Sequence, residues 1–172
     1  MADAAADERE YTEYVTARLP ALRRLAYVLC GDAHRADDVV QQTITALFVR
    51  WRKVRTVSHL DGYVRSMLVH AFIDERRLGW AKVRLFREIP ERAQPPDQDF
   101  AERSVVRAAL AQVPPRQRAV LVLRFVYDLP VAEVAEALHC SEGTVKSQTS
   151  RGLTTLRRLL GERQFAAFAQ ER

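Results

Sequence analysis

Residues 128–160 read DLPVAEVAEALHCSEGTVKSQTSRGLTTLRRLL, and this stretch decides the fold of the C-terminal half. Pro130 suits the first turn of a helix, because the N–H that it lacks would find no intrahelical partner there. Apolar residues then recur at helical spacing from Val131 to Leu138, and the Ser141 hydroxyl can cap a following helix. Two helices joined by so short a turn predict a helix-turn-helix.

The second helix of this pair is expected to divide its side chains between two faces. The inward positions are Val145, Thr149, Leu153 and Leu156. The outward positions carry hydroxyl, amide and basic groups, namely Thr144, Lys146, Ser147, Gln148, Ser150 and Arg151. Short hydroxyl side chains allow close approach to a DNA groove, where Gln, Lys and Arg can bond base edges. The alternative is a solvated face on a plain helical hairpin.

Helical periodicity also dominates the sequence before this stretch. Apolar residues fall three or four apart over residues 11–29, 35–51 and 63–78, which predicts three helices packed into one domain. The middle helix is expected to bury a stripe made of Val39, Val40, Ile44, Leu47 and Phe48. The pattern stops between Gly79 and Phe100, where prolines stand among charged residues. We therefore expect an all-α fold of two small helical domains joined by a flexible linker.

The composition fits a soluble globular protein. The chain has 172 residues, of which 48% are hydrophobic and 28% charged. Its net charge of +5 favours a polyanionic partner such as nucleic acid. No apolar run approaches the roughly 20 residues that cross a bilayer, and the first residues lack the basic and apolar parts of a signal peptide. We expect a cytoplasmic protein without membrane insertion.

Neither a metal site nor a catalytic site is predicted. Cys30 and His34, joined by His139 and Cys140, are conceivable metal ligands, but the two pairs lie in different expected domains. Adjacent residues also do not easily face one ion. The sequence contains no Walker loop, no zincin motif and no nucleophile and base at a catalytic spacing. The protein is therefore expected to need no metal or cofactor and to have no enzyme activity.

Three stretches, two in the N-terminal half and one in the C-terminal half, carry a family resemblance, and they occur in the same order as in the family. Residues 113–158, VPPRQRAVLVLRFVYDLPVAEVAEALHCSEGTVKSQTSRGLTTLRR, resemble region 4 of bacterial RNA polymerase sigma factors, especially the extracytoplasmic-function (ECF) group. Residues 32–51, DAHRADDVVQQTITALFVRW, resemble region 2.2, and residues 64–77, VRSMLVHAFIDERR, resemble regions 2.3 and 2.4. The segment GTVKSQTSRGL is most similar to an actinobacterial branch.

The resemblance implies a dissociable promoter-specificity subunit and a division of the chain. An acidic N-terminal tail would occupy residues 1–10, region 2 residues 11–80, a linker residues 81–101, region 4 residues 102–163 and a C-terminal tail residues 164–172. Core RNA polymerase and promoter DNA would be the partners, an anti-sigma factor would be a further candidate, and the free protein would be a monomer. Within the C-terminal tail, Phe165 and Phe168 are expected to cover the region 4 core rather than bind a partner helix.

The resemblance also implies three sets of site residues. Core polymerase would be bound by Asp38, Gln41 and Gln42, although the family often has an acidic residue where Gln42 stands. The minus-ten element would be met by His70, Asp74, Arg76 and Arg77, and His70 stands where the family usually has asparagine. The minus-thirty-five element would be met by Thr144, Lys146, Ser147, Gln148, Ser150 and Arg151, with Arg157, Arg158 and Arg163 suited to phosphates.

Simpler interpretations stay open for two of these sets. Asp38 and the two glutamines could be a solvated helix face, and His70 could be a partly buried histidine. At the level of function, the rivals are an autonomous helix-turn-helix regulator that binds an operator as a dimer and an adaptor that only bridges proteins. The sequence shows no long apolar heptad seam for such a dimer.

Overall fold

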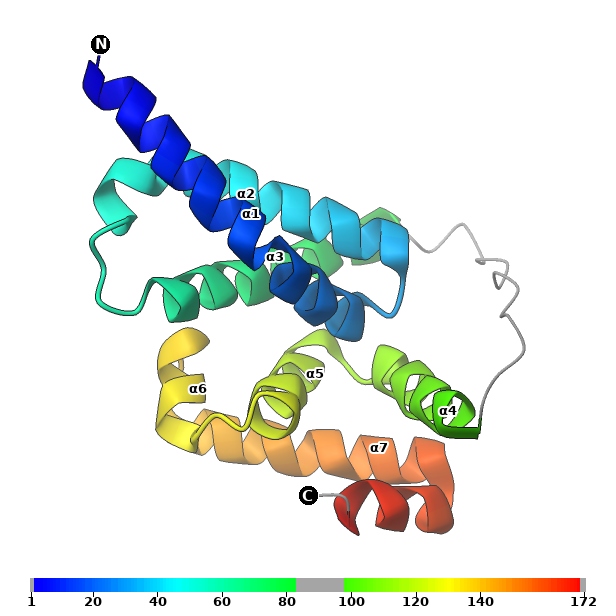
Figure 1. Cartoon of the computed structure of the whole chain (residues 1–172). Coiled ribbons are helices and arrows are strands. Elements are labelled where there is room, and N and C mark those ends of the chain that lie inside the picture. Colours follow the sequence, from blue (N-terminus) through cyan, green and yellow to red (C-terminus); the bar gives the residue numbers. More distant parts are fainter. Residues whose placement is uncertain (1, 83–97, 171–172) are drawn as a thin grey trace.

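The computed structural model describes residues 2–82 and 98–170, and all regular structure in those two ranges is helical (Figure 1). The elements are α1 (Ala2–Cys30), α2 (Ala33–Val54), α3 (Leu60–Lys82), α4 (Gln98–Gln112), α5 (Pro115–Leu121), the π-helical stretch η1 (Val122–Val126), α6 (Val131–Ala137) and α7 (Glu142–Gln170). The expected all-α fold is confirmed. None of the described helices is long and apolar enough to span a bilayer.

Helices α1, α2 and α3 form the N-terminal bundle. Its core contains Leu25, Leu29, Leu47, Leu68 and Phe72, each at most 2% exposed. The sharp turn between α1 and α2 depends on Gly31, whose φ of +72° is strained for residues that carry a Cβ. Asp32 then caps α2, since its Oδ1 accepts a hydrogen bond from the Arg35 N–H at 2.8 Å.

The first helix begins nine residues earlier than the expected start at residue 11. Residues 2–10, expected as an acidic tail, continue α1, and Asp7 is buried. Its Oδ2 accepts a hydrogen bond from the Arg52 Nε at 2.7 Å, and Arg55 lies 3.7 Å from its Oδ1. Residues 2–10 are therefore held against the end of α2. Periodicity within these residues could not predict this contact, because the partner lies elsewhere in the chain.

Helices α4 to α7 form the C-terminal unit. Pro115 occupies the first turn of α5, and α6 and α7 make the predicted helix-turn-helix. A Cβ added at Gly152 of α7 would lie 3.0 Å from Leu121, so glycine lets α7 pack closely on α5. At Gly161 the φ of 74° bends α7 and returns the chain so that Phe165, 8% exposed, joins the core with Leu156.

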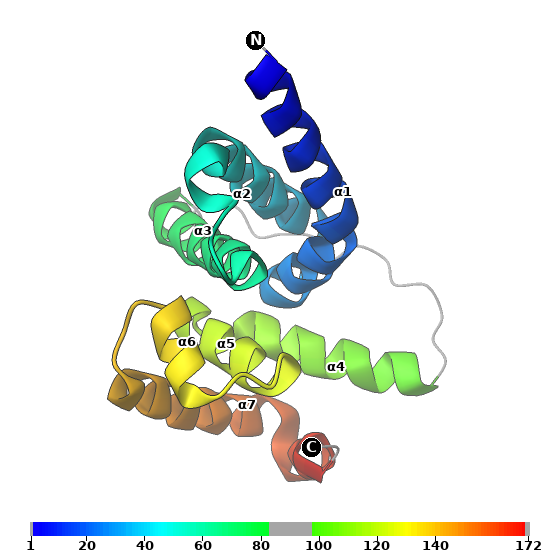
Figure 2. The same cartoon turned by 60° about the vertical axis from the view of Figure 1, so that its left-hand side comes forward.

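The two halves pack directly against each other. In both views the N-terminal bundle lies above the C-terminal unit, and α4 lies below the end of α1 (Figures 1 and 2). One hydrophobic cluster includes Leu29 and Phe72 from the bundle with Val120 and Leu123 from the unit. The expected linker at 81–101 falls mostly outside the described residues, and α4 already begins within it at Gln98.

Candidate polymerase and nucleic-acid interfaces

The start of α7 is fixed by its capping residue. The Ser141 Oγ accepts a hydrogen bond from the Thr144 N–H at 3.1 Å and lies 2.9 Å from the Thr144 hydroxyl. Val145 and Leu156, on the inward face of α7, are fully buried, as expected. Thr149 is half-buried, and its hydroxyl donates to the Val145 carbonyl at 2.8 Å. The cap and the buried stripe together set which side chains of α7 face outward.

Five of the six residues expected on the outward face of α7 are exposed, namely Thr144, Lys146, Ser147, Ser150 and Arg151. Gln148 is half-buried. The Ser147 hydroxyl donates to the Thr144 carbonyl at 2.9 Å, and Lys146 lies 4.0 Å from Glu142 one turn earlier. An exposed pair of this kind contributes little to stability, so Lys146 can exchange Glu142 for another anion at small cost.

The basic face continues toward the bend of α7. Arg157 lies over the Phe165 ring at 4.5 Å, and Arg158 is exposed. The side chains of Arg163 and Phe168 lie outside the described part. Arg157 is therefore held by the segment expected as a C-terminal tail, and that segment helps to orient the basic face.

The outer face of α2 carries the three residues expected to bind polymerase. Asp38, Gln41 and Gln42 are all exposed, whereas Val39 and Val40 on the opposite side are at most 2% exposed. The structure thus places the three side chains on one accessible surface.

This face of α2 also contains two exposed apolar side chains, of which Phe48 was expected to be buried and Val49 was not predicted at all. Val49 is 80% exposed and lies two helical turns beyond Gln42. Phe48, expected in the buried stripe, is 54% exposed and packs edgewise on Tyr11 with ring centroids 5.0 Å apart. The expectation that Phe48 is buried was wrong: the aromatic side chain of α2 that enters the core is Trp51, which is 3% exposed and packs on Tyr11. The exposure of Val49 could have been predicted from helical spacing, because residues 38, 42, 45 and 49 lie on one side of a helix.

The residues expected at the minus-ten element are only partly accessible. His70 is half-buried, and its Nε2 lies 3.1 Å from the Ala137 carbonyl oxygen at the end of α6. Its ring also lies 4.9 Å from that of His139, in the turn of the helix-turn-helix. Asp74 is exposed, and the side chains of Arg76 and Arg77 lie outside the described part. Half-burial of His70 agrees with the simpler interpretation left open above.

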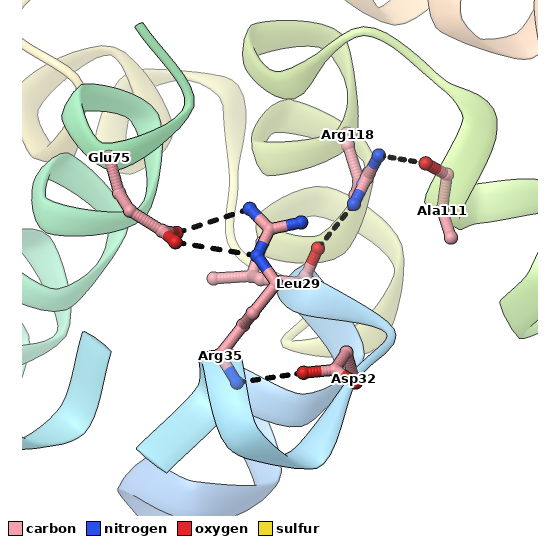
Figure 3. A network of polar contacts seen from close by, with 6 residues as sticks. All are labelled: Leu29, Asp32, Arg35, Glu75, Ala111 and Arg118. Carbon is pink, nitrogen blue, oxygen red and sulfur yellow. Dashed lines mark hydrogen bonds and ion pairs between the residues drawn. The ribbon is translucent and has the colours of Figure 1, made fainter. Parts of the chain in front are cut away.

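Neighbouring polar contacts fix the position of α3. Arg35 at the start of α2 donates from Nε and Nη2 to the Glu75 carboxylate, both at 3.3 Å (Figure 3). At the other end of the bundle, the Tyr14 hydroxyl donates to Asp61 at 2.9 Å. Burial and this hydrogen bond raise the pKa of Tyr14 above its usual value. Sequence reasoning missed Glu75, which ties α3 to the first turn of α2 through Arg35.

The structure offers no described cluster suited to a metal ion. Across the two described ranges, three or more His, Cys, Asp or Glu side chains do not come together in such a group. Cys30 is buried and Cys140 is half-buried. The described surface presents exposed basic and hydroxyl side chains at the start of α7 and a separate polar face on α2. The first has the chemistry for binding DNA and the second for binding protein.

A helix-turn-helix whose second helix exposes basic and hydroxyl side chains is typical of DNA-binding proteins. Sequence comparison identifies the class more closely: the sigma-70 region 4 family matches residues 103–156, and the sigma2 domain of PhyR matches residues 15–60. The chain is 35% identical to the RNA polymerase sigma-E factor of Streptomyces coelicolor over 169 residues, covering 95% of this chain and 93% of that protein.

Two further comparisons agree. The ECF RNA polymerase sigma factor SigL of Mycobacterium tuberculosis is 32% identical, with 82% of this chain and 83% of that protein covered. The sigma factor RpoE of Bartonella quintana, solved in complex with the anti-sigma factor NepR, superposes with a TM-score of 0.69 at 25% identity, covering 88% of this chain and 97% of that one. This chain belongs to the ECF group of sigma-70-type RNA polymerase sigma factors.

Proposed function

We propose that this protein binds core RNA polymerase through the outer face of α2 and directs it to promoters through α3 and α7. The observation that carries the proposal is the row of exposed hydroxyl and basic side chains at the capped start of α7, in a chain similar to ECF sigma factors along its length. Catalysis of RNA synthesis would belong to the polymerase, so the protein itself would be no enzyme and would act in the cytoplasm. The similar sigma factor RpoE was solved in complex with the anti-sigma factor NepR, so an anti-sigma factor is a candidate regulator of this protein.

The α2 face is proposed as the polymerase-binding surface. Asp38, Gln41 and Gln42 are exposed together and form no part of the described core, so their removal should leave the fold intact. The double substitution Asp38→Ala and Gln41→Ala should weaken binding to core polymerase by about tenfold or more, as loss of an interface hot spot does. Glu13→Ala is the matched control, because it removes an exposed carboxylate from α1, outside this face of α2. Equal affinities of both variants in a pull-down would refute this surface.

Recognition of the minus-thirty-five element is proposed for α7. Lys146 and Arg151 can reach base edges or phosphates, and losing one base contact costs about 1–3 kcal/mol. Lys146→Ala and Arg151→Ala should each reduce transcription from promoters that depend on this element while core binding stays unchanged. Thr154→Ala is the control, since Thr154 is exposed farther along the same helix. Full transcription by both basic-residue variants would show that the outward face is misassigned.

Run-off transcription with purified core polymerase, with and without the protein, tests the function as a whole. Promoter-specific transcripts should appear only when the protein is present. The rival, an autonomous regulator, predicts instead a dimer that binds duplex DNA tightly without polymerase. Failure to stimulate core polymerase on a library of promoter fragments would reject the sigma-factor function.

A further inference from the structure

The loop that joins α2 to α3, residues 56–59, is held at both ends by α1. Arg55 precedes the loop at the C-cap of α2, and Asp61 follows it in the first turn of α3. Figure 1 shows this loop on the same side of the bundle as the start of α1. Both flanking residues pair with side chains of α1, so one helix sets the position of both ends of the loop.

Two carboxylates of α1 hold the first end of the loop. The Glu10 Oε2 accepts a hydrogen bond from the Arg55 Nη1 at 2.7 Å, and the Asp7 Oδ1 lies 3.7 Å from the Arg55 Nη2. The other carboxylate oxygen of Asp7 accepts from the Arg52 Nε at 2.7 Å. The Arg55 backbone N–H also donates to the Trp51 carbonyl at 2.9 Å, which closes the last turn of α2. Arg55 is therefore fixed both by its own helix and by α1.

Two further side chains of α1 hold the second end of the loop. The Tyr14 hydroxyl donates to the Asp61 Oδ1 at 2.9 Å, and the Arg18 Nη2 lies 2.7 Å from the Asp61 Oδ2. Both oxygens of this carboxylate are therefore engaged by α1. The α1 residues that hold the loop are three or four positions apart, so they share one face of the helix. We call them the bracing residues: Asp7, Glu10, Tyr14 and Arg18.

The loop held in this way presents side chains that are available to a partner. Val57 is 40% exposed, and no hydrogen bond or ion pair to another described residue engages the exposed side chains of Thr56, Ser58 and His59. The loop backbone is nevertheless fixed, because the Val57 N–H donates to the end of α2 and the Tyr63 N–H donates to the His59 carbonyl, both at 3.0 Å. Binding by a loop that is already ordered requires little further loss of conformational entropy.

The surroundings of the loop suit a nucleic-acid strand. Arg50 and Lys53, in the last two turns of α2, are exposed, whereas the carboxylates of the bracing residues pair with Arg52 and Arg55. Exposed cations beside hydroxyl, imidazole and apolar side chains can contact the phosphates and the unstacked bases of a single strand. The loop also leads directly into α3, which is one of the two helices proposed above to direct polymerase to promoters.

We propose that the bracing residues position the loop for promoter recognition, and that they thereby determine which bases the loop and the start of α3 accept at the minus-ten element. The inference rests on the proposed function, because it names residues that tune the same promoter-binding site. The bracing residues are positioning residues, since they act through Arg55 and Asp61 and not by contact with DNA. The acidic start of the chain, which was expected as a tail, thus contributes to promoter preference.

The exposure of the ion pairs allows positioning to be separated from stability. The side chains of Arg18 and Asp61 are 51% and 53% exposed, and those of Arg55 and Glu10 are 36% and 48% exposed. Ion pairs as exposed as these contribute little to the stability of a fold. They can still select one loop geometry, because exposed loops lie at the low end of the range of local stabilities within a protein. Their removal should therefore alter the loop and leave the bundle folded.

Transcription from a promoter library tests whether the bracing residues set base preference. The test variant, Glu10→Ala with Arg18→Ala, removes one contact at each end of the loop. The matched control, Arg9→Ala with Glu13→Ala, removes the same two residue types from exposed positions on another face of α1. Run-off transcripts are counted with core polymerase on promoters that carry randomised bases in both elements. In the test variant, preference at one or more minus-ten positions should fall by about fivefold or more, as a lost base contact would cause. Preference at the minus-thirty-five element, and both preferences in the control, should stay unchanged.

The pattern of preferences decides between positioning and a general defect. Equal preferences in the test variant and the unsubstituted protein would overturn the proposal. An equal loss of preference at both promoter elements would also overturn it, because that pattern indicates damage to the whole protein. Glu10→Gln with Arg18→Lys keeps an acceptor and a donor at the two positions, so this conservative variant should recover most of the minus-ten preference.

Amide hydrogen exchange measures the loop directly in the full-length protein, without polymerase. The N–H groups of Val57 and Tyr63 close the two ends of the loop, and they should exchange about threefold faster or more in the test variant than in the control. The N–H of Leu68, in the bundle core, should exchange at the same rate in both variants. Equal exchange at Val57 and Tyr63, with normal transcription by the unsubstituted protein, would reject the bracing role and leave the sigma-factor function standing. Absence of transcription by the unsubstituted protein would instead reject that function and, with it, the promoter role of the bracing residues.

Discussion

Arg118 shows how one residue can serve two helix ends at once. A guanidinium has five N–H donors in a fixed fork, so it can satisfy several carbonyls that no neutral side chain could reach together. Its ring-stacking neighbour is Phe72 of α3, 5.5 Å away, so the same group touches three segments of the chain. Nothing in the PPRQR segment by itself predicts that Arg118 lies in the core, where it is 1% exposed.

Replacing Arg118 by Ala should be strongly destabilising. The carbonyls of Leu29, Ala111 and Val113 would lose their donor, and each buried acceptor left unpaired costs about 1–3 kcal/mol. We expect the free energy of unfolding, measured with urea, to fall by about 3 kcal/mol or more, with partial recovery in Arg118→Lys. Arg116→Ala, at an exposed position two residues earlier, is the control and should change it little. A loss below about 0.5 kcal/mol in Arg118→Ala would contradict the assigned role.

Tyr14 is expected to make the stability of the protein sensitive to alkaline pH. Burial and the bond to Asp61 raise the pKa of Tyr14 in the folded state, while the unfolded chain keeps a value near 10.0. The stability that this tyrosine contributes is complete below the unfolded value and is lost as the pH rises above it. Urea unfolding between about pH 8 and pH 11 should therefore show a smaller decline for Tyr14→Phe than for the unsubstituted protein. Parallel declines would count against the bond as a source of this sensitivity.

At the scale of single elements, α7 is the helix whose cap and faces the local sequence pattern predicted best. The cap at Ser141, the buried stripe and the exposed polar face all follow from residue spacing, because a helix presents every third or fourth side chain to the same side. Helix α2 shows the limit of this method. Its buried stripe was placed correctly except at Phe48, which is 54% exposed and packs on Tyr11 of α1, a residue distant in the chain.

A charged side chain on the buried face of α7 should unfold the helix-turn-helix. Val145 is fully buried in the cluster that joins the two halves, and Val145→Asp would place an unpaired carboxylate there. We expect loss of cooperative unfolding for the C-terminal unit and a fall in helix content by circular dichroism. Thr154→Asp adds the same charge at an exposed position of α7 and should leave the helix content unchanged. A folded, cooperative Val145→Asp variant would contradict the packing of this helix.

At the scale of the whole molecule, the two proposed DNA-binding faces should bind promoter DNA only weakly without polymerase. Each half offers only a few phosphate contacts, and non-specific binding of that kind has dissociation constants of roughly 10⁻⁴–10⁻⁶ M at physiological salt. Core polymerase would hold both halves along one promoter and raise the effective concentration of the second contact. Fluorescence anisotropy with duplex promoter DNA should therefore show weak, salt-sensitive binding by the free chain. Nanomolar, sequence-specific binding would favour the autonomous regulator instead.

The sequence by itself determined the helices, the helix-turn-helix and the family, because these depend on short-range spacing and on motifs that lie within single segments. It also placed Asp38, Gln41 and Gln42 on one face of α2, although their binding role stays a prediction. Only the tertiary structure decided that residues 2–10 form helix against α2 and that the two halves contact each other. The physical reason is that these features depend on partners distant in the chain, such as Asp7 with Arg52 and Arg118 with Leu29. Periodicity within a segment carries no information about which distant surface will complete it.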